Sequence, residues 1–194
     1  MTNGNIIILN GTSSSGKTSV LRALQEILEE PYVEAGIDKF IWMLPHRYLD
    51  RPLWDEVLGL AVEAGPLGHR LVSGMHHAIA ALSLAGNHVL ADHVLVEPRW
   101  LQECVDLFSD LPAFLVAVRC PLAVLEQREK ERTNRTLGQA KAQFGVIHAH
   151  GVYDLEVDTS VHSPLECAQQ IKARLLDGAP PNALKRLKII ASTG

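Results

Sequence analysis

The sequence has few cysteines and no long apolar run. Its 194 residues include three cysteines, Cys104, Cys120 and Cys167, and no CxxC pair. An odd number at wide spacing argues against a disulfide framework and a zinc knuckle, so we expect buried reduced thiols. No run approaches the roughly 18–20 apolar residues of a transmembrane helix, and no signal peptide is recognisable. We therefore expect a cytoplasmic protein without a membrane partner.

The sequence also lacks an excess of positive charge and a recognisable zinc motif. The formal net charge is −4 and charged residues make up 21%, which gives no reason to expect a nucleic-acid partner. There are nine histidines, but H-x-x-x-H and H-E-x-x-H are absent. His76 and His77 are adjacent, so on a helix they point to different sides. The histidines therefore do not predict a zinc site.

Apolar runs of strand length alternate with longer amphipathic stretches. The runs span residues 5–10, 32–36, 88–92, 113–120 and 152–159. Parallel neighbours need crossover connections, which the amphipathic stretches between the runs supply as helices. The pattern predicts an α/β fold with a five-stranded parallel sheet flanked by helices.

The chain divides into one long and one short segment by composition. Residues 1–177 are predicted to form a single domain, a normal size for an α/β unit. Residues 178–194 contain two prolines and three basic residues but no acidic residue. We expect a loosely held C-terminal tail there. The alternative is an amphipathic segment that docks on a partner subunit.

Residues 11–18 read GTSSSGKT and match the phosphate-loop pattern G-x-x-x-x-G-K-[ST]. A strand precedes this stretch and a helix follows it, as the motif requires. Its glycines let phosphate oxygens approach backbone N–H groups, Lys17 can reach the β- and γ-phosphates, and Thr18 can offer its hydroxyl to Mg²⁺. The guanine-reading pattern N-K-x-D is absent, although ATP and GTP both stay open. The expected nucleotide contacts are Gly11, Thr12, Ser13, Ser14, Ser15, Gly16, Lys17, Thr18 and Ser19.

Two carboxylates follow predicted strands, where ligands bind in such a fold. Asp38 comes just after the second strand. It can accept the proton of an acceptor hydroxyl, cap the helix that begins near Lys39, or do both. Asp92 ends the third strand in HVLAD and is a candidate to hold Mg²⁺ through water or to polarise the substrate hydroxyl. His93 beside it contacts substrate or only ends the strand.

Three arginines lie in the stretch QREKERTNR, namely Arg128, Arg132 and Arg135. We predict a lid near residues 128–140, in which Arg132 and Arg135 neutralise the transferring phosphate and Arg128 contacts the nucleotide. The alternative is a solvated charged helix, because glutamates are interleaved with the arginines. An apolar acceptor pocket is a further hypothesis, with Trp42, Met43, Tyr48, Trp54 and Met75 as candidates.

These residues together resemble the chloramphenicol phosphotransferase family of P-loop kinases. The resemblance covers about residues 6–171 and rests on IIILNGTSSSGKTS, GIDKF, GNHVLADHVL, VAVRCPLAVLEQRE and VYDLEVDTSVHSPLECA. It implies a shikimate- and adenylate-kinase-like three-layer sandwich and a homo-oligomer. It also implies that Asp38 is the general base. The sequence departs from the family at His93, where a second Asp is expected, and over residues 44–65.

We therefore expect a kinase that moves the γ-phosphate of ATP, with Mg²⁺, to a hydroxyl of a small molecule. Chloramphenicol or a related antibiotic is one candidate acceptor. One alternative is a metabolite or nucleotide kinase of the shikimate, gluconate or adenylate type. Another is a regulator that binds nucleotide without catalysis, although the intact Lys17, Thr18, Asp38 and Asp92 argue against it.

Overall fold

A computed structural model describes residues 2–48, 64–131 and 137–193 of the chain. Five strands form one sheet in the order β2-β3-β1-β4-β5, and every neighbouring pair is parallel. The prediction of a five-stranded parallel sheet is confirmed. The strands are β1 (Ile6–Asn10), β2 (Tyr32–Glu34), β3 (His88–His93), β4 (Ala113–Arg119) and β5 (Leu155–Asp158).

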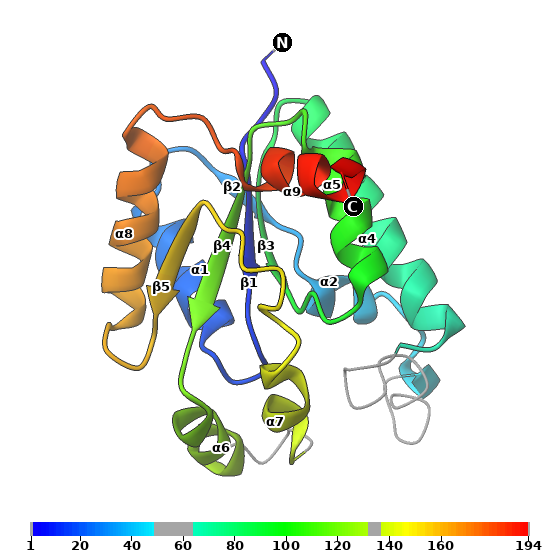
Figure 1. The fold of residues 1–194 in the computed structure, drawn as a ribbon, viewed down its shortest axis with the longest axis vertical. Helices are drawn as coiled ribbons and strands as arrows, with labels where there is room; N and C mark the ends of the chain where they lie inside the picture. Colours follow the sequence, from blue (N-terminus) through cyan, green and yellow to red (C-terminus); the bar gives the residue numbers. More distant parts are fainter. Residues whose placement is uncertain (1, 49–63, 132–136, 194) are drawn as a thin grey trace.

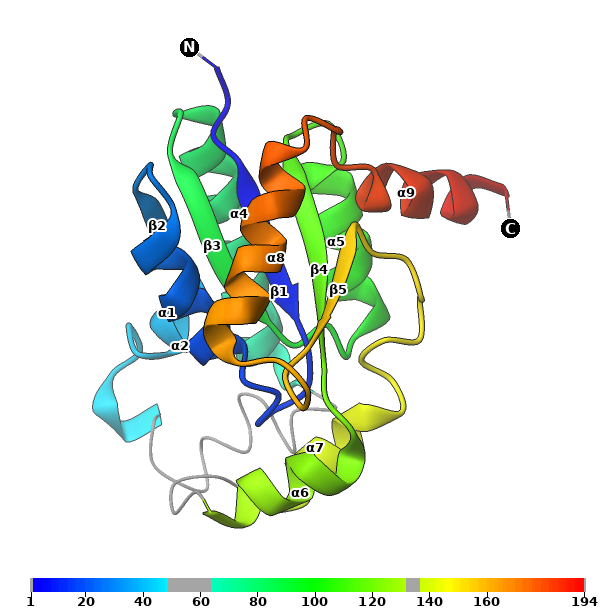
Figure 2. The ribbon, with the colours of Figure 1, turned by 90° about the vertical axis from the view of Figure 1, so that its left-hand side faces the viewer.

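Helices cover both faces of this sheet (Figures 1 and 2). One face carries α1 (Lys17–Ile27) and α8 (Pro164–Leu176), which pack against each other. The other carries α4 (Pro66–Leu84) and α5 (Pro98–Phe108). This is the predicted three-layer arrangement. Shorter elements lie near the carboxyl ends of the strands, namely α2 (Ile37–Ile41), a 3₁₀ turn (His46–Tyr48), α6 (Leu122–Glu131) and α7 (Gln139–Phe144).

Strand β1 lies at the centre of the sheet and is buried on both faces. Its apolar side chains are at most 1% exposed. Ile6 and Ile8 pack into the core beneath α4 and α5, whereas Ile7 and Leu9 pack into the core beneath α1 and α8. A continuous apolar run is what a strand buried on both faces needs, because successive side chains point to opposite faces.

The C-terminal segment differs from the expected loosely held tail. Residues Ala183–Thr193 form helix α9, which packs against α5 and β4. Leu184 and Leu187, one helical turn apart, are buried in the core on that face. The Asp154 carboxylate accepts hydrogen bonds from the backbone N–H groups of Asn182 and Ala183 at the start of this helix. Apolar burial and this cap hold the segment, which its composition alone did not indicate.

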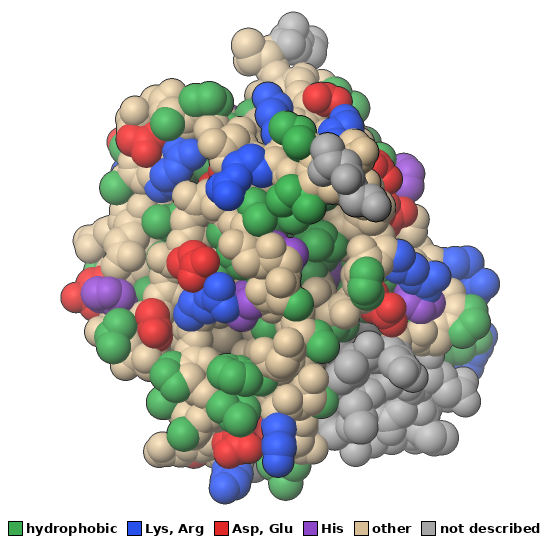
Figure 3. Space-filling view, viewed as in Figure 1, with side chains coloured by type: hydrophobic (Ala, Val, Ile, Leu, Met, Phe, Trp, Pro, Cys, Tyr) green, Lys and Arg blue, Asp and Glu red, His purple; other side chains and the backbone are tan. Residues whose placement is uncertain are grey.

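The surface shows no concentration of one charge on the face drawn in Figure 3, where basic and acidic side chains are interspersed. Among the described residues, none of the helices combines the length and the apolar character that a membrane span requires.

Candidate active site

The GTSSSGKT stretch forms the connection between β1 and α1. Helix α1 begins at Lys17, directly after Gly16, which has φ 89°. Ser14 also has a positive φ, 63°, which a non-glycine residue adopts at a cost. The loop therefore holds a left-handed conformation at two positions, as a backbone that curls around an anion requires.

Three consecutive serine hydroxyls of this loop are buried without a hydrogen-bond partner. Ser13, Ser14 and Ser15 are 7%, 5% and 1% exposed. Their Oγ atoms have no partner among the described residues. A buried hydroxyl without a partner is costly, so such atoms indicate a polar ligand. Together with the N–H groups at the start of α1, they fit the oxygens of a nucleotide's phosphates.

Lys17 is folded back along the loop. Its ammonium donates hydrogen bonds to the carbonyl oxygens of Gly11 and Thr12, over 2.8 and 2.7 Å. The residue is 8% exposed. Its charge therefore lies within the curve of the loop, next to the place where a phosphate would bind.

Thr18 and Asp92 connect the loop to the neighbouring strand. The Thr18 hydroxyl donates a hydrogen bond to Asp92 Oδ2 over 3.1 Å. Asp92 is 7% exposed, at the carboxyl end of β3. A hydroxyl and a carboxylate are hard oxygen ligands of the kind that Mg²⁺ prefers. The pair therefore fits the metal that the sequence predicts. When bound there, Mg²⁺ would neutralise charge on the phosphate oxygens.

Gly36 brings the end of β2 against the same carboxylate. A Cβ atom at this position would lie 1.8 Å from Asp92 Oδ1, so a side chain here would force that carboxylate to move. Gly36 is also the N-cap of α2, which makes the alternative role of Asp38 as that cap wrong. Asp38 lies instead within the first turn of α2, half-buried and two residues from the contact with Asp92.

His93 is buried rather than presented to the cleft. It is 2% exposed, and its Nε2 lies 2.7 Å from Nε2 of His76 on α4. His76 Nδ1 in turn lies 2.6 Å from Oε2 of Glu103. The other oxygen of this carboxylate, Oε1, accepts a hydrogen bond from the Ser73 hydroxyl. Burial lowers the pKa of both His76 and His93. His93 therefore belongs to a buried chain of neutral rings that ends on a carboxylate.

The same cluster contains the atoms of a potential metal site, since His76, His93 and Cys104 place one ligand atom each within 4.8 Å. The hydrogen bonds assign the protons differently. The backbone N–H of Val94 donates to His93 Nδ1 over 2.7 Å, so the proton of the neutral ring sits on Nε2. That nitrogen then has no lone pair for a metal. Burial also raises the pKa of the Cys104 thiol, which keeps it protonated. A hydrogen-bonded chain accounts for the cluster better than a metal does.

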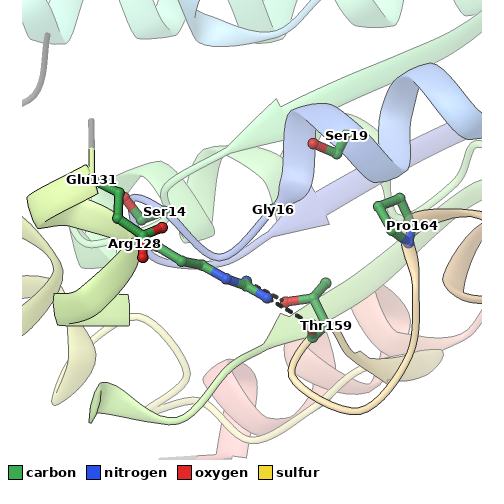
Figure 4. Close-up of a pocket in the computed structure, with 7 residues that line it drawn as sticks. All are labelled: Ser14, Gly16, Ser19, Arg128, Glu131, Thr159 and Pro164. Atoms are coloured by element: carbon green, nitrogen blue, oxygen red, sulfur yellow. Dashed lines mark hydrogen bonds between the residues drawn. The ribbon is translucent and has the colours of Figure 1, made fainter. Parts of the chain in front are cut away.

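Arg128 extends from α6 toward Thr159 beside the phosphate loop (Figure 4). Its guanidinium donates to the hydroxyl and the carbonyl of Thr159, over 3.1 and 2.8 Å. The Thr159 hydroxyl donates to the carbonyl of Ser15 over 2.7 Å. A pocket of about 280 Å³ opens here between α1, α6 and the start of α8. It is lined by Ser14, Gly16, Ser19, Arg128, Glu131, Thr159 and Pro164.

Several residues that the sequence predicts for the site are not seen in contact with the phosphate loop. Arg132, Arg135 and Trp54 lie outside the described residues. Met75 is fully buried in the core, so it does not line an acceptor pocket. Trp42 and Met43, by contrast, are 63% and 67% exposed just after Asp38.

Two residues that contact the phosphate loop were not predicted from the sequence. Thr159 reaches Ser15 from 144 residues away, and Gln143 reaches Ser13 from 130 residues away. Both contacts join segments that are distant in sequence, and neither residue type is distinctive on its own. The DT pair at the end of the last strand was the available signal for Thr159, whereas Gln143 had none.

Comparison with solved structures places the fold among the P-loop kinases. A tunicamycin resistance protein from Deinococcus radiodurans matches with a TM-score of 0.65 at 18% identity, over 92% of this chain and 99% of that one. A gluconokinase from Sinorhizobium meliloti 1021 matches with a TM-score of 0.61 at 17% identity, over the whole of both chains. A shikimate kinase from Acinetobacter baumannii gives 0.56 at 17%, over 90% and 94%. The predicted kinase fold is confirmed.

Sequence comparison identifies closer relatives. Two proteins from Mycobacterium tuberculosis strains, each named "Putative O-phosphotransferase", are 32% identical to this chain over 201 residues. The match covers 97% of this chain and 89% of each relative. The sequence profile described as "Chloramphenicol phosphotransferase-like protein" matches residues 4–176. The chain therefore belongs to the chloramphenicol phosphotransferase-like family, as its motifs indicated.

Proposed function

We propose that this P-loop kinase transfers the γ-phosphoryl group of Mg²⁺-bound ATP to a hydroxyl of a small molecule. One observation carries the proposal: Asp92 contacts Thr18 of the phosphate loop through one oxygen and abuts Gly36 through the other. The loop that would hold the donor and the helix that carries Asp38 thus meet at a single carboxylate. A phosphoryl transfer needs donor and acceptor groups at such a junction.

The described residues divide the work of the reaction between them. Lys17 and the three serine hydroxyls would contact the phosphates, and Thr18 and Asp92 would hold the metal. The pocket beside Arg128, which Gly16 and Ser19 also line, would receive the base and ribose of the nucleotide. Arg132 and Arg135, which lie outside the described residues, would add positive charge near the transferring group as part of this proposal.

Asp38 is the general base in this scheme. It lies in the first turn of α2, two residues from the glycine that touches Asp92. From there its carboxylate would orient the acceptor hydroxyl and accept its proton during transfer. The exposed Trp42 and Met43, which directly follow the helix that carries Asp38, favour an acceptor with an apolar portion. Chloramphenicol or a related antibiotic is the acceptor class that the family suggests.

A panel of acceptors tests the proposal. ADP release from ATP is measured with chloramphenicol, tunicamycin, gluconate and shikimate, and the phosphorylated product is identified by ³¹P NMR. Asp38→Asn should lower the transfer rate by about 10²–10⁴-fold while ATP affinity stays within about twofold. Asp110→Asn, at an exposed carboxylate in the turn that follows α5, is the matched control. Full transfer by Asp38→Asn would overturn the base assignment. Tight ATP binding with no acceptor-stimulated turnover would favour a regulator.

A further inference from the structure

One peptide group of the phosphate loop is held from both sides. The carbonyl of Thr12 accepts a hydrogen bond from Lys17 Nζ over 2.7 Å and one from the Ser15 N–H over 3.3 Å. The N–H on the other side of that peptide belongs to Ser13, and it donates to Oε1 of Gln143 over 2.6 Å. The orientation of this peptide plane therefore depends on Lys17 at one edge and on Gln143 at the other.

Gln143 is well placed to fix that orientation. It lies on α7, is 1% exposed, and its amide must present oxygen to the loop because the backbone N–H can only donate. Helix α7 is itself anchored by Glu129 of α6, whose carboxylate accepts from the N–H groups of Gly138 and Ala140 over 2.7 and 3.0 Å. Glu129 is 2% exposed. The oxygen that Gln143 offers is thus held by a buried, hydrogen-bonded support.

We propose that Gln143 is a positioning residue that sets the place of the Lys17 ammonium through the Thr12–Ser13 peptide. An amide that donates at its N–H is a stronger acceptor at its carbonyl, because hydrogen bonds in a chain polarise one another. Gln143 therefore both orients the Thr12 carbonyl and strengthens its bond to Lys17. This inference rests on the proposed function, in which Lys17 contacts the β- and γ-phosphates.

The test separates this role from that of an ordinary buried amide. Gln143→Met keeps the volume of the side chain and removes the acceptor. Gln139→Met makes the same substitution one turn earlier on α7, at a side chain that is 8% exposed. Affinities for Mg·ATP and for AMP are measured by calorimetry. AMP has no β- or γ-phosphate, so Lys17 should matter little to it.

We expect Gln143→Met to weaken ATP binding about tenfold, as for a buried N–H left without its acceptor, with AMP affinity unchanged. Gln139→Met should change neither. The second part is a double-mutant cycle with Lys17→Met. If Gln143 acts through Lys17, Gln143→Met should have no further effect on ATP affinity in the Lys17→Met protein. Glu129→Gln, which weakens the support of α7, should give the same ATP-specific loss to a smaller degree.

Three results would overturn the inference. These are additive effects in the cycle, an equal loss of AMP and ATP affinity, or an unchanged ATP affinity in a folded Gln143→Met protein. Thermal melting shows whether each variant is folded. If Gln143→Met does not fold, the same measurements are made on Glu129→Gln instead. If the wild-type protein fails to bind ATP, the proposed function fails separately. The Ser13 amide proton resonance then still reports whether Gln143 accepts its hydrogen bond.

Discussion

Asp92 lies between Thr18 and Gly36, with one carboxylate oxygen 3.1 Å from the threonine hydroxyl and the other against the glycine Cα. A single side chain on β3 thereby connects the phosphate loop with the helix that carries Asp38. The position of this carboxylate is consequently sensitive to changes on either side, which leads to the first two predictions.

Removing the hydroxyl of Thr18 should reduce the effect of Mg²⁺ on nucleotide binding. We expect Thr18→Val and Asp92→Asn each to lower the affinity for Mg²⁺ about 10–100-fold. This is the usual cost of losing a group that holds or orients a metal ligand. The measurement is a Mg²⁺ titration of ATP affinity. Thr18→Ser keeps the hydroxyl and should behave like the wild type. A Thr18→Val protein with the wild-type Mg²⁺ dependence would remove Thr18 from the metal site.

Adding a methyl group at Gly36 should displace the Asp92 carboxylate. A Cβ would lie 1.8 Å from Oδ1, so Gly36→Ala should destabilise the fold by about 1–3 kcal/mol. It should also lower the Mg²⁺-dependent ATP affinity. Gly145→Ala is the matched control, because nothing lies within 4 Å of its Cβ and its φ is −74°. Urea denaturation and calorimetry measure the two effects, and a neutral Gly36→Ala would contradict this account of the contact.

The buried serine hydroxyls of the phosphate loop should lower the stability of the free protein and raise its affinity for ATP. Ser14→Ala removes a hydroxyl without a partner among the described residues, so we expect the free energy of unfolding to rise by about 1 kcal/mol. ATP affinity should fall at the same time. Ser83→Ala should have the opposite effect on stability, because its buried hydroxyl donates to the Gly4 carbonyl over 2.6 Å. Denaturation of both variants tests this contrast, and a less stable Ser14→Ala would disprove it.

Stability should decline as the pH falls below about 6.5. Burial, and then the charge of Arg119, lower the pKa of His148 to about 4, and burial also lowers the pKa of His76 and His150. Each ring binds a proton more readily in the unfolded chain, so its contribution to stability is present above the ordinary pKa and is lost as the pH falls below it. For His148 the loss runs from about pH 6.5 to about 4. Melting temperatures from pH 7.5 to 4.5 measure the decline.

Substituting one of these histidines provides the control for the pH effect. His148→Gln should flatten the decline, whereas the same change at the exposed His77 should not. A stability that does not vary over this pH range would contradict the assignment of neutral buried rings.

The parts of the site that the sequence predicts correctly are local. The phosphate loop can be predicted because a strand, a turn and the start of a helix follow one another within 14 residues, 5–18. Each of the three has a recognisable sequence pattern. Asp92 is predicted at a strand end for the same reason. Its contact with Thr18 spans 74 residues and becomes visible only once the sheet order is known.

The parts that the sequence does not predict depend on tertiary packing. The histidine chain joins His76 on α4 with His93 on β3, whereas spacing rules for histidines recognise neighbours on one helix. The C-terminal helix was obscured by its composition, although Leu184 and Leu187 already stood at helical spacing. In both cases the residues can be identified in the sequence, but the side chains that they contact come from distant segments and cannot.

Helix α9 has a consequence for the order in which the two faces of the sheet are completed during translation. The core beneath α1 and α8 contains described residues no later than Leu175, so it can close once α8 has left the ribosome. The core beneath α4 and α5 needs Leu184 and Leu187, from the last described helix to be synthesised. This second face therefore stays partly open until synthesis reaches α9. A nascent chain paused before that point would present an apolar surface to chaperones.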